Sequence, residues 1–164
     1  MCLVLVPEKM CTFKKRDSLL MHLHAIIDCP QLFIGHDAQN HWLYVNWKGE
    51  YDQESSRVAC GLMLEILQAW PCHKILNDNT SVSRITAQLI QSGAIWLEEL
   101  RAAGLQFIAW VLPYDLLARQ AIEATVHAID QPCVGTFDDL ASAYGWLQQQ
   151  TNSAQLQQPV ASKE

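Results

Sequence analysis

Hydrophobic and polar positions alternate with two different periods along residues 31–148, and these periods predict strands and helices. Residues 32–36 and 41–47 are rich in aromatic and β-branched side chains and are joined by a short polar turn, which predicts an antiparallel hairpin. Apolar residues then recur four apart, which predicts a helix that Asp52 caps and that ends before Pro71.

The rest of this region repeats the order of strand and helix. Strands are predicted at 73–77, 105–112 and 133–137, and helices at 85–103, at 116–129 and after a capping Asp138. Such alternation is typical of right-handed crossovers onto a parallel sheet. We therefore expect an α/β fold with a mixed, mostly parallel sheet of about five strands and about four helices, in which a β-hairpin comes first and its first strand lies at an edge.

The two ends of the chain carry weaker patterns. Residues 1–30 are expected to form an extension of uncertain structure, for which a strand at 1–6 and a short helix at 17–27 are one interpretation. Residues 149–164 are polar and lack periodicity, which predicts a disordered tail. The domain itself is therefore expected at residues 31–148.

Composition argues against several classes of function. The 164 residues carry a net charge of −6, and the one basic cluster, at 14–16, is too short for a surface that follows nucleic-acid phosphates. The apolar stretch at 18–27 is too short to span a membrane and lacks a signal-peptide cleavage site. Six cysteines occur without C-x-x-C spacing, which favours buried, reduced thiols. We expect a cytoplasmic protein that binds no nucleic acid and does not insert into membranes.

A polar run at 77–80 is the most informative feature of the chain. Open α/β sheets place their ligands where a strand ends in such groups just before a helix N-terminus. We expect a loop that holds a ligand or accepts a phosphate, formed by Asp78, Asn79, Thr80, Ser81 and Ser83. Asx-type turns and a serine N-cap are the alternative explanation.

Three further residues, Tyr114, Asp115 and Asp138, are predicted at the same rim, because the carboxyl ends of parallel strands meet there. Carboxylates at this rim could bind a cation, although acids are favoured at helix N-termini for structural reasons alone. The sequence contains no nucleophile elbow and no nucleotide-binding motif, and its histidines and cysteines do not form a convincing metal site. We therefore predict no catalytic residue, no metal and no cofactor.

Five of the six tryptophans support the predicted packing. Trp70, Trp96 and Trp110 fall in phase with core positions. Trp42 and Trp47 are an odd number of residues apart in one strand, so they face opposite sides of the sheet. One of these two is a candidate for an exposed aromatic at which another chain pairs.

The order and length of these elements resemble the SpoIIAA-like fold shared by STAS domains and Sec14-type lipid-binding domains. The runs at 42–49 and 74–80 resemble uncharacterised bacterial STAS/Sec14-like proteins in particular, and the resemblance covers residues 31–148. In STAS-type anti-sigma-factor antagonists, a partner kinase phosphorylates a serine at the start of the helix after the third strand. The matching region here, 78–83, offers Thr80, Ser81 and Ser83 but lacks the Asp-Ser-Ser-Gly pattern of those proteins.

Three hypotheses about function follow. The first is a non-catalytic regulatory or protein-interaction module that binds a protein partner or a second copy of itself. The second, implied by the Sec14 side of the resemblance, is a carrier or sensor of a small apolar ligand or lipid, with a cavity lined by Phe107, Trp110, Leu117 and Trp96. The third is an enzyme that uses Asp78 with Asp115 or Tyr114, and it requires these groups within hydrogen-bond reach.

Overall fold

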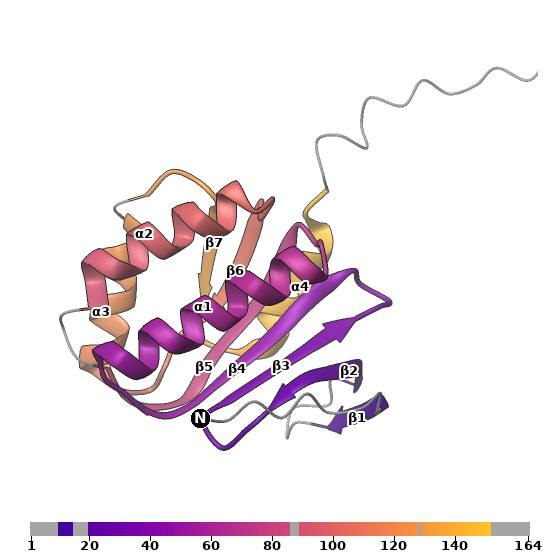
Figure 1. The fold of residues 1–164 in the computed structure, drawn as a ribbon, viewed down its shortest axis with the longest axis horizontal. Coiled ribbons are helices and arrows are strands. Elements are labelled where there is room, and N and C mark those ends of the chain that lie inside the picture. The colour runs from indigo at the N-terminus through magenta and orange to yellow at the C-terminus, as the bar shows by residue number, and fades with distance from the viewer. Residues whose placement is uncertain (1–9, 15–19, 86–88, 128, 152–164) are drawn as a thin grey trace, which may run out of the picture.

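A seven-stranded mixed sheet lies at the centre of the molecule (Figure 1). The computed structural model describes residues 10–14, 20–85, 89–127 and 129–151. The strands are β1 (Met10–Lys14), β2 (Leu20–Asp28), β3 (Leu32–Asp37), β4 (Trp42–Tyr51), β5 (Lys74–Ile85), β6 (Phe107–Val111) and β7 (Cys133–Phe137). The helices are α1 (Gln53–Ala69), α2 (Leu89–Ala102), α3 (Leu116–His127) and α4 (Leu140–Gln149).

The strands lie in the sheet in the same order as along the chain. Strands β1 to β4 pair antiparallel, and β4 to β7 pair parallel. The predicted fold class is thus confirmed, because the five strands from β3 onward begin with an antiparallel hairpin and continue as parallel neighbours. The predicted edge position of the first hairpin strand is wrong, since β2 pairs with the other side of β3.

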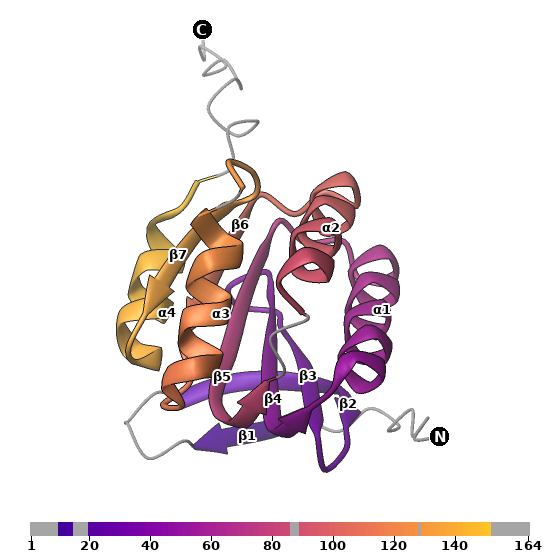
Figure 2. The same cartoon turned by 90° about the vertical axis from the view of Figure 1, so that its left-hand side faces the viewer.

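The N-terminal part of the described chain belongs to the sheet, so the short helix considered for 17–27 is wrong. Strand β2 pairs with β1 on one side and with β3 on the other. Its side chains are buried at every second position, at Met21, Leu23 and Ala25, which is the period of a strand. In Figure 2, β1 and β2 run across the line of β5, as expected for a twisted sheet. The strand considered for 1–6 and the tail beyond residue 151 lie outside the described residues.

Three helices cover one face of the sheet, and the fourth covers the other. Helices α1, α2 and α3 connect β4, β5, β6 and β7 in series, and crossovers of one hand that step in one direction place their helices on one face. Helix α4 packs on the opposite face against β5, β6 and β7. Figure 1 shows α1 and α2 in front of the strands and α4 behind them. We call these the three-helix face and the α4 face.

Helices α1 and α4 each begin at an aspartate that caps the first turn. Asp52 caps α1 as predicted, and its Oδ1 accepts a hydrogen bond from the Ser55 amide at 2.8 Å. Asp139 caps α4 by accepting from the Ser142 amide at 2.8 Å, so the predicted cap at Asp138 is wrong by one residue. Across the described ranges, we find no helix with the length and apolar character needed to cross a membrane.

The tryptophans divide between the two faces. Trp42 and Trp47 point to opposite faces, as predicted, but both are buried, so neither is the exposed aromatic that we expected. Trp96 and Trp110 are buried in the core of the three-helix face, as predicted. Trp70 is 39% exposed, contrary to the prediction, because it is the residue at which α1 ends.

Candidate functional site

The polar run at 77–80 lies inside β5 and not in a loop before a helix. Strand β5 continues to Ile85, which pairs with Tyr51 of β4, and helix α2 begins only at residue 89. The pairing of β4 with β5 has register shifts between Asn46 and Lys48 and between Gly49 and Glu50, and β5 stays paired with β4 beyond both of them. The predicted loop is therefore wrong, because the long partner strand supplies hydrogen bonds that local sequence preference does not reveal.

The serines of this segment do not lie at a helix N-terminus. Ser81 and Ser83 are exposed residues of β5, and Thr80 is partly buried. A phosphate on any of these three hydroxyls would therefore not lie at the helix amides, contrary to the prediction. Their phosphorylation stays a prediction.

Alternation along β5 sends neighbouring residues of the run to opposite faces of the sheet. Asn77 and Asn79 belong to the three-helix face, where the Asn77 Nδ2 donates to the Asn79 Oδ1 at 2.9 Å. Asp78 belongs to the α4 face with Tyr44, whose hydroxyl donates to the Asp78 Oδ2 at 2.8 Å. The run therefore contributes to two different environments and does not form one site.

The carboxylate of Asp78 is enclosed by hydrogen-bond donors. Besides the Tyr44 hydroxyl, the amide and the hydroxyl of Thr80 donate to its Oδ1 at 3.0 and 2.7 Å. Asp78 and Tyr44 have no exposed surface. Burial and the neighbouring Asp78 carboxylate raise the pKa of Tyr44 above its usual range, so the tyrosine remains a neutral donor.

The predicted rim residues do not gather around Asp78. Tyr114 is 84% exposed, and Asp115 accepts from the Ala118 amide at 2.8 Å at the start of α3. Asp138 pairs with the Arg119 Nη2 at 2.6 Å. Within the described part of the chain, neither Tyr114 nor Asp115 contacts Asp78, so the geometry that the enzyme hypothesis requires is not found there.

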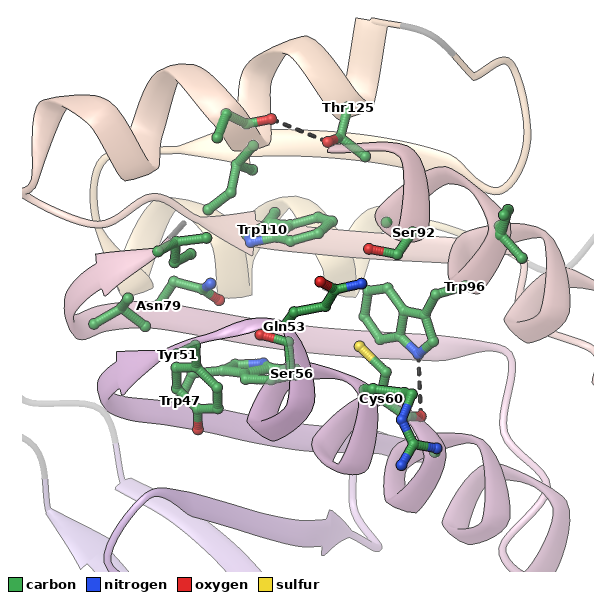
Figure 3. Close-up of a pocket in the computed structure, with 18 of the residues that line it drawn as sticks. Trp47, Tyr51, Gln53, Ser56, Cys60, Asn79, Ser92, Trp96, Trp110 and Thr125 are labelled. Atoms are coloured by element: carbon green, nitrogen blue, oxygen red, sulfur yellow. Dashed lines mark hydrogen bonds between the residues drawn. The ribbon is translucent and has the colours of Figure 1, made fainter. Parts of the chain in front are cut away.

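A cavity of about 420 Å³ opens on the three-helix face, between the sheet and helices α1, α2 and α3 (Figure 3). Its volume lies within the range of about 300 to 1,000 Å³ that is usual for small-molecule sites. We call it the tryptophan pocket. Its lining residues are Trp47, Tyr51, Gln53, Ser56, Arg57, Cys60, Gly61, Asn79, Val82, Ile85, Ser92, Gly93, Ile95, Trp96, Glu99, Trp110, Ala121, Ile122 and Thr125.

Four aromatic rings form a connected series along the pocket. Trp47 contacts Tyr51 with ring centroids 5.0 Å apart, and it contacts Trp96 at 6.3 Å. Trp96 in turn contacts Trp110 at 6.1 Å, and all three pairs meet edge to face. Edge-to-face packing fixes the rings against one another, so the pocket has a largely preformed apolar wall.

Two of the three indole N–H groups at the pocket have acceptors. Trp47 Nε1 donates to the Asn77 Oδ1 at 2.7 Å, and Trp96 Nε1 donates to the Cys60 carbonyl at 3.2 Å. Trp110 Nε1 is buried and has no acceptor among the described residues. Buried donors are nearly always paired in proteins, and Trp110 is the pocket-lining residue among the described ones whose buried donor lacks an acceptor.

Charged groups lie only at the edge of the pocket. Arg57 and Glu99 are the charged residues of its lining, and both are exposed. Arg57 is already paired with Glu54 at 2.7 Å. Burial raises the pKa of the Cys60 thiol to about 12, so this lining residue stays protonated at neutral pH and is a poor nucleophile. The lining therefore favours binding of an apolar molecule over chemistry on it.

The cavity predicted from the sequence was half correct. Trp96 and Trp110 line the pocket, whereas Phe107 packs on the α4 face and Leu117 is 73% exposed. The prediction missed the wall formed by α1. Small residues at Ser56, Cys60 and Gly61 lie on one side of that helix, and such small side chains leave room beside a helix.

Comparisons with known proteins identify the fold. No family model and no curated protein matches the sequence. The structure is similar to the crystal structure of an uncharacterised protein of the DUF3478 family with a SpoIIAA-like fold from Shewanella loihica, with 17% identity and a TM-score of 0.50 over 74% of this chain and 97% of that chain. SiaC of Pseudomonas aeruginosa matches with 13% identity and a TM-score of 0.42 over 71% of this chain and 100% of that chain. The chain thus has a SpoIIAA-like fold, as the sequence predicted.

Proposed function

We propose that this SpoIIAA-like domain is a non-catalytic module that binds a small, mainly apolar molecule in the tryptophan pocket and acts as its carrier or sensor. The observation that carries the proposal is the pocket itself, with a wall of four aromatic rings that contact one another in series and with its charged lining residues exposed at the edge. A pocket that is mostly apolar, with few polar groups, is the usual form of a small-molecule site.

The position of the pocket supports the same proposal. Asn79, Val82 and Ile85 bring it to the carboxyl half of β5, where this strand has passed the end of β6 and pairs in parallel with β4 alone. Ligands of open α/β sheets bind beyond the carboxyl ends of parallel strands. The enclosed carboxylate of Asp78 lies on the other face and is not part of this site.

A neutral aromatic probe tests the proposal. We expect 6-propionyl-2-(dimethylamino)naphthalene to bind saturably and to quench tryptophan fluorescence, because three indoles line the pocket. Gly61→Leu should weaken this binding by about tenfold or more, since Gly61 lines the pocket and a side chain there meets open space. Gly145→Leu is the matched control, because Gly145 also lies in a helix beside open space, but on α4.

Native mass spectrometry of freshly purified protein supplies an independent measurement. We expect a mass above that of the bare chain, which returns to the chain mass in a denatured sample. Absence of probe binding, or equal binding by the Gly61→Leu and wild-type proteins, would contradict the proposal.

A protein-interaction role is the second candidate. Its support is an exposed apolar patch at the start of α3, formed by Tyr114, Leu116 and Leu117. Helix α3 also lines the tryptophan pocket, so the patch and the pocket share one rigid element. Sedimentation velocity of the wild-type protein and of a Leu116→Ser/Leu117→Ser double variant tests whether a second copy binds there. A monomer at all concentrations would remove self-association from this candidate.

A further inference from the structure

We infer that the ligand of the tryptophan pocket carries an uncharged hydrogen-bond acceptor, such as the carbonyl of a ketone, ester or amide, and that Trp110 Nε1 and Asn79 Nδ2 donate to it. This inference rests on the proposed function and specifies its ligand. It follows from the donors that the pocket presents at its inner end and from the absence of a cation beside them within the described lining.

Trp110 supplies the first donor. Its side chain is 6% exposed and lines the pocket, and its Nε1 has no acceptor within the described part of the chain. Trp47 and Trp96 line the same pocket, but each donates to a protein oxygen. Among these three, only the Trp110 indole N–H has no protein acceptor within the described residues.

A chain of hydrogen bonds makes Asn79 the second donor. An indole N–H only donates, so the Trp47 Nε1 fixes the acceptor atom of Asn77 as its Oδ1. The Nδ2 of Asn77 must then donate, and the Asn79 atom that accepts from it at 2.9 Å is an oxygen. The remaining polar atom of Asn79 is therefore an NH₂ donor.

The two donors lie on neighbouring strands of one face. Trp110 of β6 is paired in register with Asn77 of β5, so Asn79 is its diagonal neighbour towards the carboxyl end. Figure 3 shows the side chains of Asn79 and Trp110 together at one end of the pocket. Asn79 is 4% exposed, so an acceptor that reaches it has left bulk water. A single carbonyl oxygen has two lone pairs and can accept from both groups.

The two donors have no charged side chain beside them within the described lining, which favours a ligand with an uncharged acceptor. A carboxylate at these donors would be buried without a counter-charge, since Arg57 is exposed at the edge and paired with Glu54. An ammonium group would face N–H donors and would have no carboxylate beside it, because Glu99 is also exposed. A neutral carbonyl on an apolar skeleton satisfies both conditions.

Two probes that differ only at the acceptor test this inference. The first is 6-propionyl-2-(dimethylamino)naphthalene, and the second is the 6-propyl analogue, in which CH₂ replaces the carbonyl. After correction for their partition between water and octanol, we expect the ketone to bind about five- to tenfold more tightly to the wild-type protein. The infrared C=O stretch of the bound ketone should lie below its value in hexane, and this readout needs no variant.

Trp110→Phe should lower the affinity ratio of the two probes, because it removes one of the two donors but keeps an aromatic ring. Trp70→Phe is the matched control, since Trp70 lies outside the pocket lining, and it should leave the ratio unchanged. Equal affinities with an unshifted C=O stretch would overturn the inference and leave the proposed function standing. Failure of both probes to bind would overturn the proposed function itself. Tighter binding of a naphthalene sulfonate than of the ketone would contradict the inference that the acceptor is uncharged.

Discussion

The polar residues of β5 differ in their hydrogen bonding between the two faces of the sheet. On the α4 face, Asp78 is fully buried and receives hydrogen bonds from Tyr44 and Thr80. On the three-helix face, Asn79 is nearly as buried, but it borders a cavity and keeps a donor that is not used by the described chain. A single helix closes the first face, whereas three helices leave a space on the second.

Because of this difference, we expect residues 77–79 to contribute unequally to stability and to binding. A buried carboxylate must be fully hydrogen-bonded to be tolerated, so Asp78 is tied to its partners. An amide is neutral and is less costly to leave with one free group beside a cavity. Asp78 is thus fixed by its protein partners, whereas Asn79 borders the pocket and is held by Asn77.

The largest effect is expected on the α4 face. Asp78→Ala removes the hydrogen bonds that Asp78 accepts from the Tyr44 hydroxyl and from the Thr80 amide and hydroxyl, and we expect the free energy of unfolding to fall by about 3 kcal/mol. Asn79→Ala should lower it by about 1 kcal/mol, because only the Asn77 Nδ2 loses a protein partner. Urea unfolding of the two variants measures this difference. Equal losses would contradict the division between the faces.

A middle-sized effect is expected where two helices of the pocket meet. A Cβ atom on Gly93 of α2 would lie 3.0 Å from the Thr125 Cγ2 of α3, so Gly93→Val should force these helices apart and cost about 2 kcal/mol. A Cβ atom on Gly145 of α4 would meet no atom within 4 Å, so Gly145→Val should leave the free energy of unfolding unchanged or slightly higher. Thermal unfolding compares the two, and a stable Gly93→Val protein would show that α2 and α3 move freely.

The periodic part of the fold was predictable because each amphipathic element displays its own period. Strand β7, at Cys133–Phe137, was predicted to the residue, and the Asp52 cap was also correct. Strand β5 was predicted too short, since its polar second half resembles a loop until the long β4 is seen beside it. The length of β5 depends on its pairing with a strand that is distant in the sequence, and local sequence preference gives no information about that pairing.

The pocket was partly predictable, and one of its errors was avoidable. Phe107 and Trp110 are three residues apart in one strand, so the two-residue period places them on opposite faces. The prediction that Leu117 lines the cavity was wrong for a different reason. Helix α3 buries the side that carries Ala118, Ile122 and Thr125, and Leu117 lies outside that side. The donor role of Asn79 was not predictable, since it depends on a contact between Trp47 and Asn77 on two strands.

The smallest effect is expected from the Cys60 thiol at the pocket wall, and it depends on pH. Burial raises its pKa to about 12, whereas an unfolded cysteine ionises near pH 8.5, at about its ordinary value. The neutral thiol therefore contributes stability that is complete below about pH 8.5 and is lost as the pH rises towards 12. Between pH 8 and pH 9 we expect the wild-type protein to lose about 0.7 kcal/mol more than Cys60→Ala. Cys133→Ala is the control, because Cys133 is exposed on β7, and it should follow the wild-type slope in urea unfolding at each pH. An identical slope for Cys60→Ala and the wild-type protein would mean that solvent reaches the thiol and that this wall of the pocket is open.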